Sequence, residues 1–598
     1  MDGDGHRLID GPAGLAAELD EAPTVTVGRL SSGSGPSSGS GPSSGSGTIR
    51  FRGIGGNPWA WTAAAVLPVA FLAIFFAWPV TALVARGFVI DGQPTLAGVQ
   101  EVLAAPRTWR IVTQTFTQAV LGTLAAVVLG VPGAYVLYRR RFPGRRLARA
   151  VVSVPFVLPT VVVGVAFQSL LAPKGPLGNL HLQESLTAIV AALVFFNYSV
   201  IVRTVGALWS RLDPRAEDAA RSLGAGRLRV LATVTLPALA PAIASGAALV
   251  FLFCASAFGI VLVLGGETYG TIETEIWYQT TQLLDLPAAA ALSILQLLVV
   301  SASLMVAGAT RARQERALRL SGNPVDAPLR ASDLPAVLLT AVVVAGLLLF
   351  PMGSLVWRSF VTADGLGLAN YAALSGTAGT ITVSIWQALL NSLATALAAT
   401  LIAIGLGLLV SYVLSRRPAS RLGRRTMRTV DAVFMLPLGV SAVTVGFGFL
   451  ITLNRPPLDL RSSWLLIPIA QAMVALPLVV RTLLPTLRAI DPRLHEAAAT
   501  LGAGPGRVVA TIDAPFALRG LGLALGFAFA TSLGEFGATS FLARPDRPTL
   551  PVVIFQLIGR PGAENFGTAM AASVILAVLT ATVMGLAEWI GPREVHPW

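Results

Sequence analysis

The sequence reads RLDPRAEDAARSLGAGRLRVLATVTLPALAP at residues 211–241 and AIDPRLHEAAATLGAGPGRVVATIDAPFALR at residues 489–519. The two stretches align without a gap at an offset of 278 residues, which pairs Gly224 with Gly502. An offset that holds over a long range indicates an internal repeat, so we expect two homologous halves. The same offset relates Pro159 to Pro437, Arg203 to Arg481, Pro237 to Pro515, and Phe258-Gly259 to Phe536-Gly537.

The composition places most of the chain in a membrane. Of the 598 residues, 54% are hydrophobic and 12% are charged, against roughly 25% charged in an ordinary soluble domain. The mean hydropathy is +0.71, and so few charges do not cover the surface of a soluble protein. Apolar stretches long enough to cross roughly 30 Å of hydrocarbon as helices lie near residues 60–85, 111–138, 151–171, 185–207, 242–264, 288–309, 334–357, 384–414, 430–453, 464–485, 520–543 and 568–590.

These stretches predict an all-α polytopic membrane protein with about 12 transmembrane helices in two homologous six-helix halves. The halves have the same orientation because six is even. A Ser/Gly/Pro segment at 31–47 has nothing to bury and is typical of a flexible linker. The predicted domains are a disordered cytoplasmic tail at 1–57, a first half at 58–310, a cytoplasmic linker at 311–333 and a second half at 334–598.

Arginine placement predicts the orientation of the chain, since basic loops favour the cytoplasmic side. The loops RRRFPGRRLAR at 139–149 and RRPASRLGRRTMR at 416–428 follow the second and the eighth apolar stretch. Both termini are then expected in the cytoplasm, and the acidic loop at 265–287 is expected outside. The net charge of +13 follows from this topology, so the expected partner is the lipid bilayer and not a nucleic acid.

The repeated stretch lies on the cytoplasmic side, between the fourth and fifth helices of each half. Asp213-Pro214 and Asp491-Pro492 are helix starts, with an aspartate cap and a proline in the first turn. Short alanine-rich helices are expected over 216–223 and 494–501. Each ends at a glycine suited to positive φ, and Pro237 and Pro515 begin the next membrane helix.

Both copies resemble the signature E-A-A-x-x-x-G-x9-I-x-L-P of permease subunits of binding-protein-dependent ABC importers. Asp replaces Glu in the first copy, beside Glu217, and Ala514 replaces Leu in the second. The resemblance covers about residues 58–592 and implies the type I ABC importer permease fold. The residues it assigns to coupling are Glu217, Asp218, Ala219, Ala220, Gly224, Pro237, Glu496, Ala497, Ala498, Gly502 and Pro515.

The resemblance implies alternating access in the plasma (inner) membrane of a bacterium. The E-A-A segments would dock on two copies of a cytoplasmic ABC ATPase, which holds ATP and Mg, and an extracytoplasmic binding protein would deliver the solute. The chain's own residues agree with a separate ATPase. A Walker A loop needs Lys before Ser or Thr, whereas Lys174, the sole lysine, precedes Gly175. We expect no catalytic residue, no metal site and no bound cofactor in this chain.

The stretches YRRRFPGR at 138–145, FCASAFGIVLVLGG at 253–266 and SLGEFG at 532–537 look similar to thiamine permeases. The resemblance therefore favours thiamine, or a phosphorylated form, as the substrate. The alternative is a ferric-iron importer permease. The four histidines are scattered, and this slightly disfavours metal coordination by the chain.

The predicted translocation pathway follows from a carboxylate inside an apolar stretch, which is expensive and faces a cavity or a partner. That residue is Glu535, which either meets an organic cation, lies near water at the outer end of its helix, or pairs with an arginine such as Arg544. The pathway residues predicted at this level are Ser256, Phe258, Ser532, Glu535 and Phe536.

Two other classes of protein fit the sequence less well than an importer permease does. An ion-driven secondary transporter does not need paired E-A-A loops and should carry more carboxylates within the membrane. A membrane-embedded enzyme needs clustered Asp, His or Glu side chains at one depth, and the sequence has no such cluster.

Overall fold

The computed structural model describes residues 66–590 except 91–92, 267, 318–326, 363, 377–381, 416–420 and 457. The chain divides into two units, 1–49 and 50–598, and every described residue belongs to the second, which is compact. The predicted tail at 1–57 and part of the predicted linker at 311–333 lie outside the described residues.

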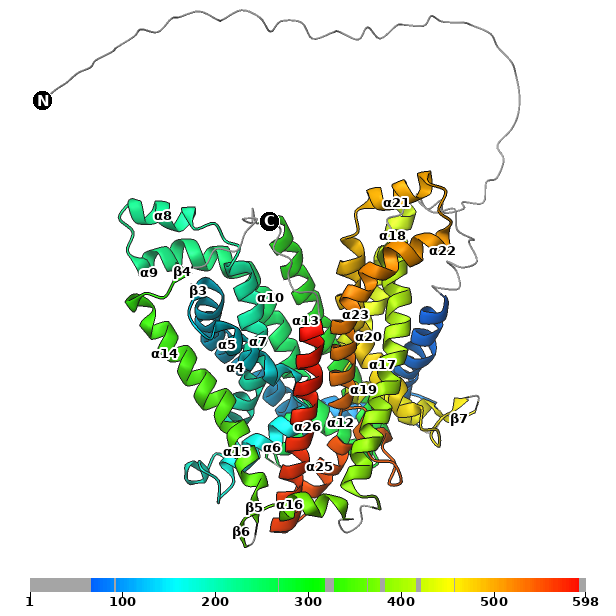
Figure 1. Ribbon diagram of the computed structural model, residues 1–598. Helices are drawn as coiled ribbons and strands as arrows, with labels where there is room; N and C mark the ends of the chain where they lie inside the picture. Colours follow the sequence, from blue (N-terminus) through cyan, green and yellow to red (C-terminus); the bar gives the residue numbers. More distant parts are fainter. Residues whose placement is uncertain are drawn as a thin grey trace, which may run out of the picture. The chain divides into compact units, whose positions relative to one another are not determined.

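The described part of the first half is helical except for short strands (Figure 1). Its first membrane-crossing helix spans Val66–Gly87. The elements are η1 (Ala73–Ala77), α2 (Trp78–Gly87), β1 (Val89–Ile90), β2 (Gln93–Pro94), α3 (Ala97–Ala104), α4 (Pro106–Ala134), η2 (Tyr135–Arg139), β3 (Arg140–Arg141), α5 (Arg145–Val157), α6 (Thr160–Leu171), η3 (Gly178–Leu180), α7 (Leu186–Trp209), α8 (Arg215–Ser222), α9 (Arg227–Val230), η4 (Leu231–Thr235), α10 (Leu236–Ala255), α11 (Gly259–Leu264), α12 (Ile272–Thr281) and α13 (Leu286–Ala317).

The second half follows the same plan. Its elements are β4 (Ala327–Pro328), η5 (Ala331–Asp333), α14 (Leu334–Val342), η6 (Val343–Leu349), α15 (Phe350–Ser359), β5 (Val361–Thr362), β6 (Gly365–Leu366), α16 (Ala369–Ala372), η7 (Ala373–Ser375), α17 (Ile385–Ser415), α18 (Arg421–Met435), η8 (Leu436–Gly439), α19 (Ala442–Thr452), β7 (Asn454–Arg455), β8 (Leu458–Asp459), α20 (Leu466–Arg488), α21 (Pro492–Thr500), α22 (Pro505–Val508), η9 (Val509–Asp513), α23 (Ala514–Leu533), α24 (Thr539–Leu542), α25 (Leu550–Ile558) and α26 (Ala563–Ile590).

The strands are two residues long and form four two-stranded pairs. Three of the pairs are antiparallel hairpins, β1–β2, β5–β6 and β7–β8. The fourth joins β3 to β4 in parallel, with Arg140 opposite Ala327 and Arg141 opposite Pro328. This last pair ties the arginine loop of the first half to the segment that leads into the second.

The element bounds confirm the internal repeat. The π-helical turns η4 and η9 begin 278 residues apart, at Leu231 and Val509, and the helices α10 and α23 follow each of them directly. The helices α12 and α25 begin at Ile272 and Leu550, again at the same offset. The two halves therefore share local structure as well as sequence.

Ten helices in the described part are long and apolar enough to cross a membrane, and one bent pair raises the number to eleven. The third apolar stretch of each half is not the straight helix that the sequence predicts. α5 and α6 meet at a bend of 101°, and α18 and α19 are separated by the turn η8. Pro159 and Pro437 lie at these breaks, where proline cannot continue a hydrogen-bonded helix.

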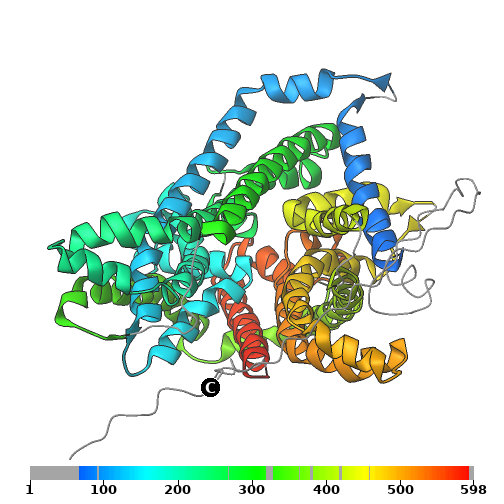
Figure 2. The same ribbon diagram turned by 90° about the horizontal axis from the view of Figure 1, so that it is seen from above.

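The two halves exchange their first helices. α2 packs against α19 of the second half, and α15 packs against α6 of the first. Figure 2 shows the blue α2 beside the yellow helices of the second half. Gly448 on α19 permits this approach, because a Cβ there would lie 3.1 Å from Pro79 Cβ. One cluster of buried apolar side chains consequently contains residues of both halves.

Candidate functional site

Two short exposed helices, α8 and α21, lie at the same end of the second compact unit (Figure 1). Their starts confirm the predicted caps: Asp213 Oδ1 accepts a bond from Arg215 N at 3.0 Å, and Asp491 Oδ1 accepts one from Arg493 N at 2.9 Å. Each helix is followed by a glycine with positive φ, as predicted. The values are +84° at Gly224 and +72° at Gly502.

The predicted coupling residues lie on these two helices and just after them. Neither helix has a buried residue. Two apolar side chains at equivalent positions are even more exposed, since Leu223 is 89% and Leu501 is 86% accessible. Pro237 and Pro515 are the second residues of α10 and α23. The repeat therefore presents one exposed leucine at the end of each short helix.

Each short helix is held to the π-helical turn that follows it, but with different chemistry in the two halves. In the first half, Thr235 Oγ1 donates to Glu217 Oε1 at 2.9 Å. In the second half, His495 Nε2 lies 2.8 Å from Asp513 Oδ1. The two contacts occupy equivalent positions at the repeat offset, and each includes one carboxylate. That carboxylate is Glu217 on the short helix in the first half and Asp513 on the π-helical turn in the second.

The predicted pathway residues lie where two membrane helices break. α10 ends at Ala255 and α11 begins at Gly259, while α23 ends at Leu533 and α24 begins at Thr539. The side chain of Ser256 is used by its own helix, because Oγ donates to Leu252 O at 2.8 Å. The sequence predicted unbroken helices here. The breaks place these pathway residues, except Ser532 in the last turn of α23, in irregular backbone, which lipid-exposed segments do not tolerate.

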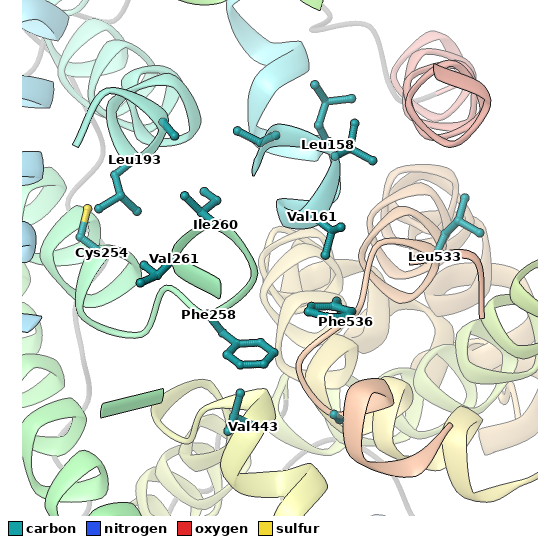
Figure 3. Close-up of a cluster of buried hydrophobic side chains, with 14 of the residues drawn as sticks. Leu158, Val161, Leu193, Cys254, Phe258, Ile260, Val261, Val443, Leu533 and Phe536 are labelled. Atoms are coloured by element: carbon teal, nitrogen blue, oxygen red, sulfur yellow. The ribbon is translucent and has the colours of Figure 1, made fainter. Parts of the chain in front are cut away.

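The two phenylalanines of these breaks meet between the halves. Phe258 and Phe536 stack with ring centroids 5.4 Å apart and planes 19° apart, and Figure 3 shows them side by side within the buried apolar cluster. Trp277 and Phe555, also related by the repeat offset, pack edge to face at 5.8 Å. Phe258 contacts Trp277 and Phe536 contacts Phe555, so the four rings form one contiguous aromatic cluster.

Glu535 is buried beside this cluster and is 7% exposed. Its Oε1 accepts from Ala538 N at 2.7 Å and its Oε2 accepts from Thr539 N at 3.1 Å, so it caps α24. Arg544 binds Asp546 at 2.9 Å and not Glu535, whereas contact of Glu535 with water stays a prediction. Ser532 is fully buried, and its hydroxyl has no hydrogen-bond partner among the described residues.

A second buried carboxylate was missed by the sequence analysis. Glu273 is on α12, inside the segment 265–287 that was predicted to be an external loop, and it is fully buried. It accepts from Gln296 Nε2 at 2.6 Å and from Ser441 Oγ, in the other half, at 2.6 Å. The internal repeat could have indicated this helix. Thr271 aligns with Thr549 at the same offset, and Thr549 directly precedes the apolar helix α25.

Neither of these carboxylates forms an ion pair with a described cation of the chain. The other acidic residue of α12 differs, because Glu275 pairs with Arg107 at 3.0 Å. The interface between the halves therefore holds two buried carboxyl groups and a cluster of four aromatic rings.

The model of the family described as "Binding-protein-dependent transport system inner membrane component" matches residues 120–314 and 403–596. The two matches cover more than half of the chain. The chain belongs to this family. As a permease of the family it is a multi-pass inner-membrane subunit with two permease domains. It is not itself catalytic and binds no cofactor, and ATP is hydrolysed by a partner subunit.

Relatives of this permease include transport proteins that are named for different substrates. The chain is 26% identical over 493 residues to the thiamine transport system permease protein ThiP of Brucella abortus (strain 2308), covering 80% of this chain and 87% of that protein. It is 31% identical over 254 residues to the sulfate transport system permease protein CysT of Salmonella typhimurium, covering 41% and 89%. A bacterial importer of the acidic polysaccharide alginate is similar at 17% identity with a TM-score of 0.38, covering 44% and 96%.

Proposed function

We propose that this permease imports thiamine, or a phosphorylated form of it, delivered by an extracytoplasmic binding protein and driven by two copies of a cytoplasmic ABC ATPase. The observation that supports the substrate is the match over both halves to a thiamine permease. The chemistry of the interface is consistent with it, because thiamine carries two aromatic rings and a positive charge. Aromatic faces and carboxylates attract such a cation.

The coupling surface in this proposal consists of α8 and α21 with their exposed leucines. The supporting observations are the absence of buried residues on both helices and the matching positions of Leu223 and Leu501. The residues predicted for coupling from Glu217 to Gly224 and from Glu496 to Gly502 form the rest of this surface. The same end of the chain would then face the cytoplasm, together with both termini.

The translocation pathway in this proposal runs along the interface between the halves and is closed by the aromatic cluster of Phe258, Trp277, Phe536 and Phe555. The rings come in two pairs related by the repeat, which is the arrangement expected at an axis between two equivalent halves. A change in the distance between α8 and α21 would move α10 and α23, and Phe258 and Phe536 lie just after the ends of these two helices.

The domain limits remain part of the proposal: a cytoplasmic tail at 1–57, permease domains at 58–310 and 334–598, and a linker at 311–333. The exchange of first helices does not alter these limits along the chain, but it means that neither half buries its apolar surface alone.

The test is uptake of labelled thiamine by proteoliposomes that contain the permease, its ATPase and the binding protein encoded beside it. We expect uptake that requires ATP and loaded binding protein. Uptake of ferric iron with none of thiamine or its phosphates would overturn the substrate. Uptake driven by an ion gradient without the ATPase would overturn the transport class.

A further inference from the structure

A cavity of about 900 Å³ lies beside the first coupling helix. Its walls come from α4, from the segment α8–η4 and from the residues that lead into α14. It therefore adjoins both the first half and the start of the second. It shares Glu217, Asp218 and Thr235 with the first coupling helix and its turn, but the arginines of its wall are not part of the coupling site described above.

The cavity has one apolar side and one basic side. The apolar side includes Val127, Val128 and Val131 on α4, a helix that spans the membrane. The basic side is formed by arginines, which outnumber the carboxylates Glu217, Asp218 and Asp333 on the same wall. These arginines are Arg139, Arg140, Arg221, Arg227 and Arg330.

All three carboxylates of the cavity are already neutralised by neighbouring arginines. Asp333 binds Arg140 at 3.0 Å, Asp218 binds Arg221 at 2.9 Å, and Glu217 lies 3.9 Å from Arg139. Arg227 and Arg330 form no ion pair with a described residue. The excess positive charge of the cavity is therefore carried by these two side chains.

We propose that this cavity binds an anionic phospholipid of the leaflet on the coupling-helix side, with its phosphate between Arg227 and Arg330 and its acyl chains along α4. Guanidinium groups bind phosphate oxygens through paired charge-assisted hydrogen bonds. Basic pockets between membrane helices on the cytoplasmic side bind anionic lipid head groups. The assignment of the leaflet to the cytoplasm rests on the proposed function.

The second half lacks the residues for a matching lipid site. Ala499 and Pro505 stand at the positions of Arg221 and Arg227. Arg227 follows the first coupling helix directly, and Arg330 precedes the first membrane helix of the second half. A lipid phosphate bound by both arginines thus joins the first coupling loop to the other half. The second coupling loop has no such link, so the two loops differ in how they are held.

The test is native mass spectrometry of the delipidated full chain titrated with phosphatidylglycerol. Arg227→Gln with Arg330→Gln should weaken binding roughly thirtyfold, from the usual attraction of two arginines for an anionic lipid. The matched control is Arg229→Gln with Arg507→Gln, which removes the same charge from exposed positions outside the cavity. Its binding should equal that of the wild type.

Equal phosphatidylglycerol binding by the two double variants would overturn the proposal. Equal binding of phosphatidylcholine by the wild type, or full displacement by inorganic phosphate, would also overturn it, because the ligand would then not be an anionic lipid. These measurements need no ATPase, so their failure is separate from a failure of transport. Thermal unfolding of each variant confirms that the chain is intact.

Discussion

His495 Nε2 lies 2.8 Å from Asp513 Oδ1, and the pair occupies the two positions that Glu217 and Thr235 hold in the first half. Both contacts join a coupling helix to the π-helical turn at the base of a membrane helix. A movement of either coupling helix is therefore transmitted through a polar side-chain contact in addition to the backbone.

Loss of the contact between His495 and Asp513 should uncouple the second half from the ATPase. His495→Ala removes a hydrogen bond to a carboxylate, which is worth about 1.5–3 kcal/mol, and we expect binding-protein-stimulated ATP hydrolysis to fall at least roughly fivefold. The double variant His495→Glu with Asp513→Thr restores the chemistry of the first half and should recover most of the activity. Thr511→Ala, an exposed change on the same turn, serves as control. Failure of the double variant to exceed the single one would contradict this role.

Opening the aromatic cluster should make the pathway leak. Phe258→Ala or Phe536→Ala removes a stacked ring at the interface of the halves, and we expect ATP-independent efflux of loaded substrate from proteoliposomes to rise several-fold. The control is Phe116→Ala, in an aromatic pair with Phe251 within the first half. If the Phe116 variant leaks as much as the interface variants, the cluster does not close the pathway.

Neutralising Glu535 should weaken transport of a cation more than it weakens folding. Glu535→Gln keeps an oxygen that can cap α24 but removes the charge, and we expect KM for uptake to rise about tenfold with a smaller change in kcat. Glu275→Gln is the control, because that carboxylate is already paired with Arg107. An unchanged KM in the Glu535 variant would show that the carboxylate only caps the helix.

Changing the glycines after the coupling helices should strain the loops without any clash. A Cβ at Gly224 or Gly502 would have no atom within 4 Å, so the cost comes from positive φ alone and is about 1 kcal/mol at each position. Gly224→Ala with Gly502→Ala should reduce recovery of the ATPase on the tagged permease. Replacement by Asn, which tolerates positive φ, should have a smaller effect. A larger effect for Asn than for Ala would rule out the conformational explanation.

The sequence was sufficient for the local features that begin and end the two coupling helices. The caps at Asp213 and Asp491 and the positive φ of Gly224 and Gly502 follow from local chemistry. The repeat offset also predicts that Phe258 and Phe536 occupy equivalent positions in the two halves.

The features that were missed depend on contacts between distant segments. Glu273 is polar and lies in a segment of mixed composition, so hydropathy alone assigns it to a loop. Its burial depends on Ser441 in the other half. The packing of α2 on α19 and of α15 on α6 leaves no pattern in the sequence. A membrane helix is apolar both where it contacts lipid and where it contacts another helix, so hydropathy does not distinguish the two faces. Pro159 and Pro437 are plain in the sequence, but the helix breaks at these prolines were not predicted.

The central claim is that α8 and α21 together form the surface that binds the ATPase. The most direct measurement is recovery of the ATPase on the tagged full chain that carries Leu223→Asp with Leu501→Asp. A matched variant carries Leu366→Asp with Leu368→Asp, where two exposed leucines lie at or beside β6 at the opposite end in Figure 1. We predict that the first variant loses the ATPase and that the second retains it. Full retention of the ATPase by the Leu223 and Leu501 variant would contradict the account.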